Sequence, residues 1–592
     1  MQTKHSKSRN DLRLPVTGVV CLLLLTGCAE KASDPNDPDI LLINGNVITM
    51  NGSASIVEAI SIRGEKIVAL GESKKIRKFA GPETEIIDLN DLTVTPGLID
   101  VHNHFAWGAL DERLSLNLAY PGVTSIGDVQ ASIEEAVQTR GPDEWIIGSK
   151  WDAGKLAEGR DMTRADLDAV APENPVWLLH TSAHYGVANS RALALANVTK
   201  DTPDPDGGVI ARDDDGNPTG ILADQAMNLV FDITPAYTTG DFAEAIAHQV
   251  RGLNAEGITT IKDPEIDRRH WDAYRQVQSH GELTVRVFAL WGRTDTLDEA
   301  KELLARIAPF TNPRKGLHDD QVISGGVKIY IDGSGTARTA WMYDEWNKNF
   351  TETDEGNYGL TYVEPDVLFE QIRLFHKAGL HVGAHAIGDR AIDFTMDAYD
   401  KILDETPTYG LRHSIIHCNI PTDHALDLMY KLQNSYDAAY PEVQPAFLWW
   451  IGDAYAANFG PDRNPRVLPL KTFLDRGIGW AASSDYDVSP FPPRYGLWAA
   501  IARQTLFGTH GKFPYGIEES ISVQDALKSY TTSAARQVFL EDKIGSIETG
   551  KYADIVVWDR DPYSVSTAAI KDLKALLTVF NGTIVHRDEA LD

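Results

Sequence analysis

Short apolar runs recur through the middle of the chain, each separated from the next by a longer amphipathic stretch. They lie at residues 98–102, 258–262, 285–291, 327–331, 381–385, 414–417 and 478–483. A short run that is apolar throughout is typical of a strand buried on both faces, and strands alternating with helices favour a parallel sheet. So many runs predict an α/β fold, a (β/α)₈ barrel of the TIM type whose first strand is 98–102.

Both ends of the chain carry a different pattern, short β runs joined by tight turns. Residues 40–43 and 46–50 flank Asn44-Gly45, and residues 577–580 and 583–585 flank Asn581-Gly582. Asn-Gly between two apolar runs is a strong hairpin signal. We therefore expect residues 39–95 and 540–592 to form one composite β-sandwich domain beside a barrel at 96–539.

The stretch from about 144 to 229 interrupts the alternation of strands and helices, with Asp, Pro and Gly clustered at 202–220. We interpret it as an insertion after the first barrel strand. Long insertions on such a scaffold often shape access to the active site.

Residues 1–27 have the features of an export signal, a basic start at 4–13 before the apolar run 19–25, which is too short to span a bilayer. The signal ends in Leu25-Thr26-Gly27-Cys28, which resembles a bacterial lipobox, in which the cysteine is lipidated. An ordinary cleaved signal with an incidental Cys28 is the alternative. Residues 28–38 would be a tether. The cysteine is followed by Ala29 and not by Asp, which resembles the pattern of Gram-negative lipoproteins of the outer membrane. We therefore expect an exported protein that is anchored by lipid to the periplasmic face of the outer membrane.

The formal net charge of −30 argues against nucleic acid as a partner, because phosphate binding needs clustered Lys and Arg. With 592 residues and 43% apolar content, the chain has material for a barrel and a smaller unit. The expected partners are a small-molecule substrate and the membrane reached through the lipid. The sequence leaves homo-oligomerisation open.

His102 and His104 end the first predicted barrel strand. Side chains two positions apart project from the same face of a strand, so both imidazoles can reach one cation, and such ligands suit Zn²⁺. A lone His-x-His is weak evidence, but the Pro96-Gly97 turn and the buried run before it strengthen a metal site here.

Several motifs in order resemble those of the amidohydrolase superfamily. Residues 96–104, Pro-Gly-Leu-Ile-Asp-Val-His-Asn-His, are similar to its first-strand signature. Residues 326–333, 385–391, 444–445, 483–485 and 545–554 extend the resemblance to amidohydrolase family 3, the branch that includes N-substituted formamide deformylase. The resemblance covers the chain from about Asp39 onward. It implies a metal-dependent hydrolase with one or two divalent ions, Zn²⁺ being expected, and candidate ligands His102, His104, Lys328, His385, His417 and Asp485.

Lys328 lies inside an apolar run, where a charged amine is costly unless it is paired or modified. In the family the equivalent lysine is carboxylated to a carbamate that bridges two metals. A lysine paired with a carboxylate, or reaching a polar strand end, is the alternative.

His385 and His417 end their apolar runs, where barrel enzymes carry catalytic residues. Structural core histidines are the alternative. The family commonly has Glu before the sixth-strand histidine, whereas Ile416 stands here, so His413 is a second candidate for that ligand.

Asp485 closes the last predicted strand, where a carboxylate can hold a metal and take a proton from water. Its motif Ser-Ser-Asp is similar to the family's Gly-Ser-Asp. A helix cap is the alternative role, for which Asp487 competes.

Four weaker candidates for substrate binding are His184, Arg338, Arg390 and Gln444. The two arginines are fork donors suited to a carboxylate, although structural ion pairs would explain them equally. The expected reaction is hydrolysis of a C–N bond in an amide, formamide or cyclic amide by a metal-activated hydroxide. A peptidase-like or lactone hydrolase, and a catalytically silent binding lipoprotein, remain alternatives.

Overall fold

The computed structural model describes residues 35–311, 319–346, 356–508 and 516–591. The predicted export signal, Cys28 and the first part of the predicted tether lie outside these residues. Among the described segments, no helix has both the length and the apolar character needed to cross a membrane.

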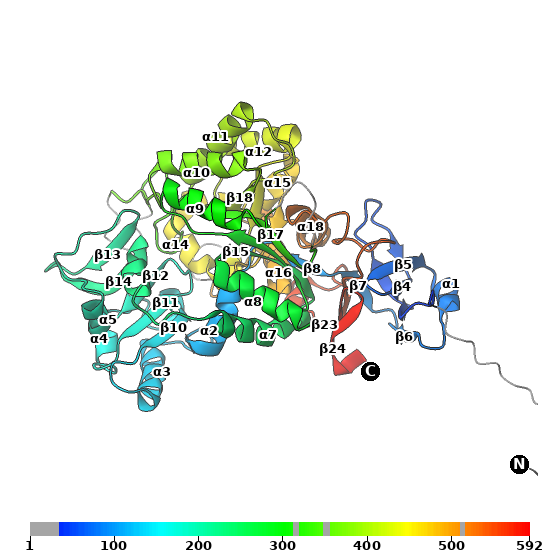
Figure 1. Cartoon of the computed structure of the whole chain (residues 1–592), viewed down its shortest axis with the longest axis horizontal. Helices are drawn as coiled ribbons and strands as arrows, with labels where there is room; N and C mark the ends of the chain where they lie inside the picture. The colour runs from blue at the N-terminus through cyan, green and yellow to red at the C-terminus, as the bar shows by residue number, and fades with distance from the viewer. Residues whose placement is uncertain (1–34, 312–318, 347–355, 509–515, 592) are drawn as a thin grey trace, which may run out of the picture.

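Eight parallel strands form a nearly closed barrel at the centre of the molecule (Figure 1). In spatial order they are β8 (Leu98–Asp100), β15 (Ile258–Ile266), β16 (Arg286–Trp291), β17 (Val322–Tyr330), β18 (His381–Ala386), β19 (Ser414–His417), β20 (Tyr440–Val443) and β21 (Ala481–Ala482). The first and last strands meet just beyond their ends, where Asn103 bridges Tyr486 and the Asp485 amide donates to the His102 carbonyl at 2.8 Å. The predicted parallel barrel is therefore present.

Strand β20 has no counterpart among the predicted runs. Its sequence Tyr-Pro-Glu-Val is not apolar throughout, because Glu442 points a carboxylate into the barrel and pairs with Lys262 at 2.6 Å. Because β20 carries one partner of this buried ion pair, a search for apolar runs does not detect the strand.

Helices follow most barrel strands, and their apolar faces cover the barrel. The main ones are α2 (Phe105–Leu114), α7 (Thr239–Ala255), α8 (Arg268–Ser279), α9 (Leu297–Ile307), α10 (Pro365–Lys377), α11 (Asp389–Glu405), α12 (Asp423–Tyr436), α14 (Gly452–Arg463), α16 (Pro493–Ala502), α17 (Val523–Ser529) and α18 (Thr532–Gln537). Helix α9 shows why they form. Thr296 and Glu299 make a reciprocal capping box at its start, and Ala300, Leu303 and Ile307 are buried at helical spacing.

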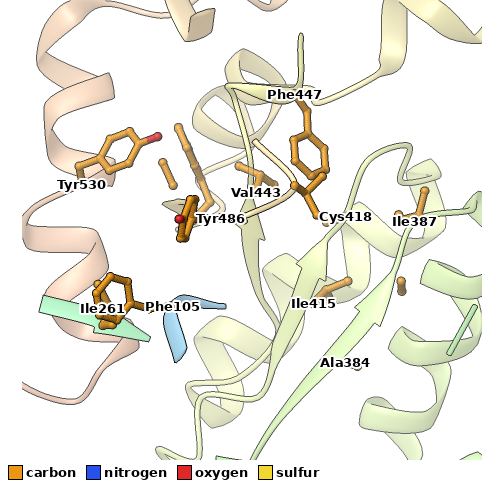
Figure 2. Packing of buried hydrophobic residues seen from close by; sticks show 14 of the residues in the cluster. Phe105, Ile261, Ala384, Ile387, Ile415, Cys418, Val443, Phe447, Tyr486 and Tyr530 are labelled. Carbon is orange, nitrogen blue, oxygen red and sulfur yellow. The ribbon is translucent and has the colours of Figure 1, made fainter. Parts of the chain in front are cut away.

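The largest apolar core lies between the barrel and these helices. Figure 2 shows part of it, with Ala384 and Ile415 on neighbouring strands and Cys418, Val443 and Phe447 gathered beyond their ends. This packing fixes the strand ends from which the candidate ligands project.

A separate sheet lies between β8 and β15 in the sequence. In spatial order it contains β13 (Gly208–Arg212), β14 (Pro218–Asp224), β12 (Tyr185–Ala188), β11 (Val176–His180), β10 (Ile146–Trp151) and β9 (Leu116–Asn117), with helices α3 (Ile126–Thr139), α4 (Arg164–Asp168) and α5 (Ser190–Leu195). It has cores of its own. The sheet begins at Leu116, earlier than the expected boundary near 144, because amphipathic α3 fits the pattern of a barrel helix equally well.

The two ends of the chain form two further sheets, on the side of the barrel opposite to the inserted sheet (Figure 1). One has the order β5 (Lys66–Gly71), β4 (Ala59–Arg63), β1 (Ile40–Ile43), β6 (Glu85–Asp88). The other has β24 (Thr583–Arg587), β23 (Ala575–Phe580), β22 (Ile555–Trp558), β7 (Thr93–Pro96), β2 (Asn46–Ile48), β3 (Ile56–Val57), so it mixes both termini. Apolar residues of both sheets share one cluster. The sandwich arrangement stays a prediction.

Candidate metal centre and active-site cavity

Three side chains at the closure of the barrel surround one point. His102 and His104 follow β8, and Asp485 follows β21. Asp485 Oδ1 lies 3.3 Å from His102 Nε2 and 3.5 Å from His104 Nε2. These three residues form a group whose ligand atoms all lie within 4.8 Å of one another, as a bound metal requires.

The other candidate ligands lie around the same point. His417 Nδ1 is 3.9 Å from Asp485 Oδ2, and Lys328 Nζ is 3.5 Å from His102 Nε2. The rings of His385 and His417 are 4.4 Å apart between centroids. All six predicted ligands are therefore gathered at the C-terminal end of the barrel.

Strand register explains how these residues meet. Tyr330 on β17 pairs with His385 on β18, and Ala386 pairs with His417 on β19, so the two histidines end adjacent strands. Lys328 lies two positions before Tyr330, the last residue of β17, so its Cα is farther from the carboxyl end of the barrel than that of Tyr330. Its long side chain brings the amine to His102.

His413, the second candidate for the sixth-strand ligand, lies elsewhere. Its Nε2 is 2.9 Å from His376 Nδ1, and its Nδ1 accepts the Val382 amide at 3.1 Å. It precedes β19, at the opposite end of the strand from His417.

Burial keeps the candidate histidines neutral. It lowers the pKa of His102, His104 and His385 well below the ordinary value, with nearby cationic groups adding to the effect. Burial likewise lowers the pKa of His417 to about 4, although the Asp485 charge opposes this. Neutral imidazole is the form that binds metals.

Burial also lowers the pKa of Lys328 to about 8, against the opposing charges of Asp485, Glu265 and Glu442. At pH 7 most of its amine therefore stays protonated, and about a tenth is uncharged, far more than for a lysine at its ordinary pKa.

Two of these residues adopt an unusual backbone conformation. His417 has φ +74° and Asp485 has φ +55°, the left-handed region that costs free energy for residues with a side chain. Such conformations cluster at active sites, where the surrounding structure holds them.

Unpartnered atoms test whether a metal fits. Asp485 Oδ1 and His102 Nδ1 are buried and make no hydrogen bond among the described residues, which is costly for a carboxylate. A divalent ion between Oδ1 and the two Nε2 atoms would satisfy that carboxylate, and nitrogen with carboxylate oxygen is a common donor set for Zn²⁺. The residues present therefore fit a divalent metal.

A cavity of about 610 Å³ opens onto the candidate ligands. Its floor includes His104, Lys328, His385, His417 and Asp485. Much of its wall comes from the inserted sheet and the segment after it, with Ile147, Trp177, Leu179, Met227 and Phe231 supplying apolar surface. The volume is typical of a site for a small molecule.

The four weaker candidates are divided by the structure. His184 lines the cavity. Gln444 does not, but it contacts a residue that does, because its Oε1 accepts a hydrogen bond from His417 Nδ1 at 2.8 Å. Arg338 and Arg390 do not line the cavity, and Arg390 lies over the Trp341 ring at 4.3 Å. The arginines that do line it are Arg269 and Arg293, neither of which is among the candidates predicted from the sequence.

Arg293 belongs to a polar cluster on the cavity wall. Its guanidinium donates to the Tyr362 hydroxyl and to Gln225 Oε1 and lies 3.9 Å from Glu265 Oε1, while Tyr330 donates to Glu265. Glu265 and Tyr330 lie at the carboxyl ends of β15 and β17, so position at a strand end is the signal that could have found them. Asp487, the competitor of Asp485, lies on the wall beside Asp111.

A model of the amidohydrolase family matches residues 85–586, and the chain belongs to this family. The family predicted from the motifs is thus confirmed, and the protein is a hydrolase. The chain is 28% identical over 565 residues to N-substituted formamide deformylase of Arthrobacter pascens, covering 92% of this chain and 98% of that protein. It is 27% identical over 551 residues to the putative amidohydrolase YtcJ of Bacillus subtilis, with the same coverage.

Among solved structures, the chain is similar to an uncharacterized metal-dependent hydrolase from Pyrococcus horikoshii. The TM-score is 0.69 at 25% identity, over 89% of this chain and 99% of that one.

Proposed function

We propose that the protein is a metal-dependent hydrolase that cleaves the C–N bond of a small amide, formamide or cyclic amide. The observation that carries this proposal is the position of Asp485, whose buried, unpartnered Oδ1 faces two histidine Nε2 atoms at the floor of the cavity. A silent binding protein has no need of such a carboxylate.

The proposed ligands are His102, His104, His385, His417 and Asp485, with Lys328 as a further one. A divalent ion held there, Zn²⁺ by its donor set, would lower the pKa of water and polarise the scissile carbonyl. Asp485 accepts the proton of the attacking water and passes it to the departing nitrogen.

Gln444 and Lys328 would serve this centre in different ways. Gln444 accepts from His417 Nδ1 and fixes the ring with Nε2 toward the cavity, as acceptors behind metal-binding histidines do. The lowered pKa of Lys328 suits carboxylation to a carbamate, since only the uncharged amine reacts, and a carbamate there would offer carboxylate oxygens to a metal.

The choice of a C–N bond is supported by relatives. The Arthrobacter pascens relative, matched over nearly its whole length, is named for the deformylation of N-substituted formamides. The apolar wall of the cavity would accept an apolar substituent. A lactone or peptidase-like substrate, with a carboxylate near Arg293, is the competing assignment.

The test combines metal analysis with a substrate panel. The purified protein is assayed for bound metal and then with formamides, other amides, cyclic amides, lactones and dipeptides. We expect bound divalent metal, turnover of amide substrates and loss of turnover with a chelator. Asp485→Asn should lower kcat by about 10²- to 10⁴-fold, the range for removal of a general acid–base. If Asp487→Asn produces this loss and Asp485→Asn does not, the proton transfer is wrongly assigned.

We also propose that the protein is exported and anchored by lipid at Cys28 to the periplasmic face of the outer membrane. The lipobox-like end of the signal supports this. Radiolabelled palmitate should be incorporated into the wild-type chain and not into Cys28→Ala, which should be released in soluble form. Equal labelling of both would contradict the anchor.

A further inference from the structure

His184 and Asp224 form a pair that the inserted sheet builds beside the metal centre. Tyr185 on β12 pairs with Ala223 on β14, so the next residues, His184 and Asp224, face each other across the two strands. The Asp224 amide donates to the His184 carbonyl at 2.8 Å, and the side chains meet with Nδ1 2.7 Å from Oδ1.

Asp224 is held firmly in this position. It is completely buried, and its backbone has φ +49°. It also lies tightly against the barrel, since a Cβ at Gly333 would come within 2.9 Å of Asp224 Oδ2. That oxygen has no hydrogen-bond partner among the described residues. Within the part of the chain that the structure describes, the His184 ring is the side chain that hydrogen-bonds this carboxylate.

His184 carries the effect of this carboxylate into the cavity. Its side chain is 14% exposed and lines the cavity. Its ring lies 5.1 Å from the ring of His385 between centroids and 6.5 Å from that of Tyr330. The imidazole is therefore next to the proposed ligands, although it comes from outside the barrel.

The bond to Asp224 decides which atom His184 presents. A carboxylate accepts, so Nδ1 carries the hydrogen, and in the neutral imidazole Nε2 keeps a lone pair. The described residues include no hydrogen-bond partner for Nε2. An acceptor fixed beside the reacting centre fits a ligand that brings an N–H.

We propose that His184, positioned by Asp224, accepts a hydrogen bond from the N–H of the scissile amide and selects secondary amides over esters, lactones and N,N-disubstituted amides. This inference rests on the proposed function and narrows its substrate class. An ester brings an oxygen lone pair to the same place, where it faces the Nε2 lone pair. A site built around such a polar contact discriminates against the analogue that lacks the donor.

The experiment compares N-butylformamide with butyl formate, in which an ester oxygen replaces the N–H. Because esters are intrinsically more reactive than amides, each variant is compared with the wild type on the same substrate. His184→Phe keeps a ring and removes the acceptor. We expect kcat/KM for the amide to fall about 10-fold or more, mainly through KM, because the bond forms on binding, and kcat/KM for the ester to change less than about 2-fold. Asp224→Asn can donate to Nδ1 and turn Nε2 into a donor, so it should lower the same amide-to-ester ratio.

His180→Phe is the matched control. His180 lies in the same segment and bonds to Ser182, but it does not line the cavity. Its substitution should leave the amide-to-ester ratio unchanged. Bound metal is measured in every variant and should equal that of the wild type, which separates the role of His184 from damage to the centre.

Two results are distinguishable failures. Suppose that the wild type hydrolyses the amide, and that His184→Phe lowers kcat/KM equally for the amide and the ester or changes it for neither. The role of His184 is then refuted while the proposed function stands. If the wild type hydrolyses butyl formate but not the amide, both the selectivity and the C–N assignment are refuted.

Discussion

Removing one partner of the ion pair inside the barrel should destabilise the protein strongly. Lys262 Nζ and Glu442 Oε1 are 2.6 Å apart, both side chains are completely buried, and Nζ is also 3.0 Å from His381 Nε2. Glu442→Leu leaves the ammonium with the histidine nitrogen alone and no countercharge. Breaking a buried pair from one side costs about 3–5 kcal/mol, whereas replacing both partners by apolar groups is often neutral or stabilising.

A double-mutant cycle measures this effect. Urea unfolding is followed by tryptophan fluorescence for Lys262→Met, Glu442→Leu and the double variant. We expect each single variant to unfold at lower urea and the double variant to recover most of the loss, because it buries no charge. Asp298→Ala, which breaks an exposed pair with Lys301 at 2.8 Å, is the control and should hardly change the midpoint. The reasoning would be refuted by single variants with the same urea midpoint as the wild type. It would also be refuted by a double variant whose loss of unfolding free energy equals the sum of the two single losses.

Two further outcomes are expected. Gln444→Leu removes the acceptor behind His417 and should weaken metal binding about 10- to 100-fold, measured by competition with a chelator; unchanged affinity would contradict a ligand role for His417. Burial raises the pKa of Asp263 from 3.8 to about 7, so the unfolded carboxyl loses its proton first and its contribution to stability falls as pH rises from about 4 to 7, by up to about 1.4 kcal/mol per unit. Asp263→Asn can still accept hydrogen bonds from the Ala106 amide and the Tyr274 hydroxyl, so it should reduce the change of the unfolding midpoint with pH over this window. An unaltered pH dependence would show that Asp263 is not protonated in the folded state.

The barrel was predictable because most of its strands are buried on both faces and therefore apolar throughout. The same rule missed β20, where Glu442 is neutralised by Lys262 from β15. It also placed the start of the inserted sheet too late, because amphipathic α3 has the pattern of any helix packed on a sheet. Local pattern records that a face is buried but not what buries it.

The metal centre divides in a similar way. His102 and His104 are recognisable locally, because alternation along one strand puts both on one side. Asp485, His385 and His417 stand out only as polar residues at the ends of apolar runs. Closure of the barrel between β8 and β21 then brings Asp485 within 3.5 Å of both first-strand histidines.

By itself, the sequence determined the kind of scaffold, the family and the candidate ligands, since periodicity and ordered motifs are local properties of the chain. Only the tertiary structure decided that His417 and not His413 faces the centre, that Arg293 and not Arg338 lines the cavity, and that Asp224 orients His184. These choices depend on register and on side chains far apart in the sequence, which meet only when the inserted sheet packs over the barrel mouth.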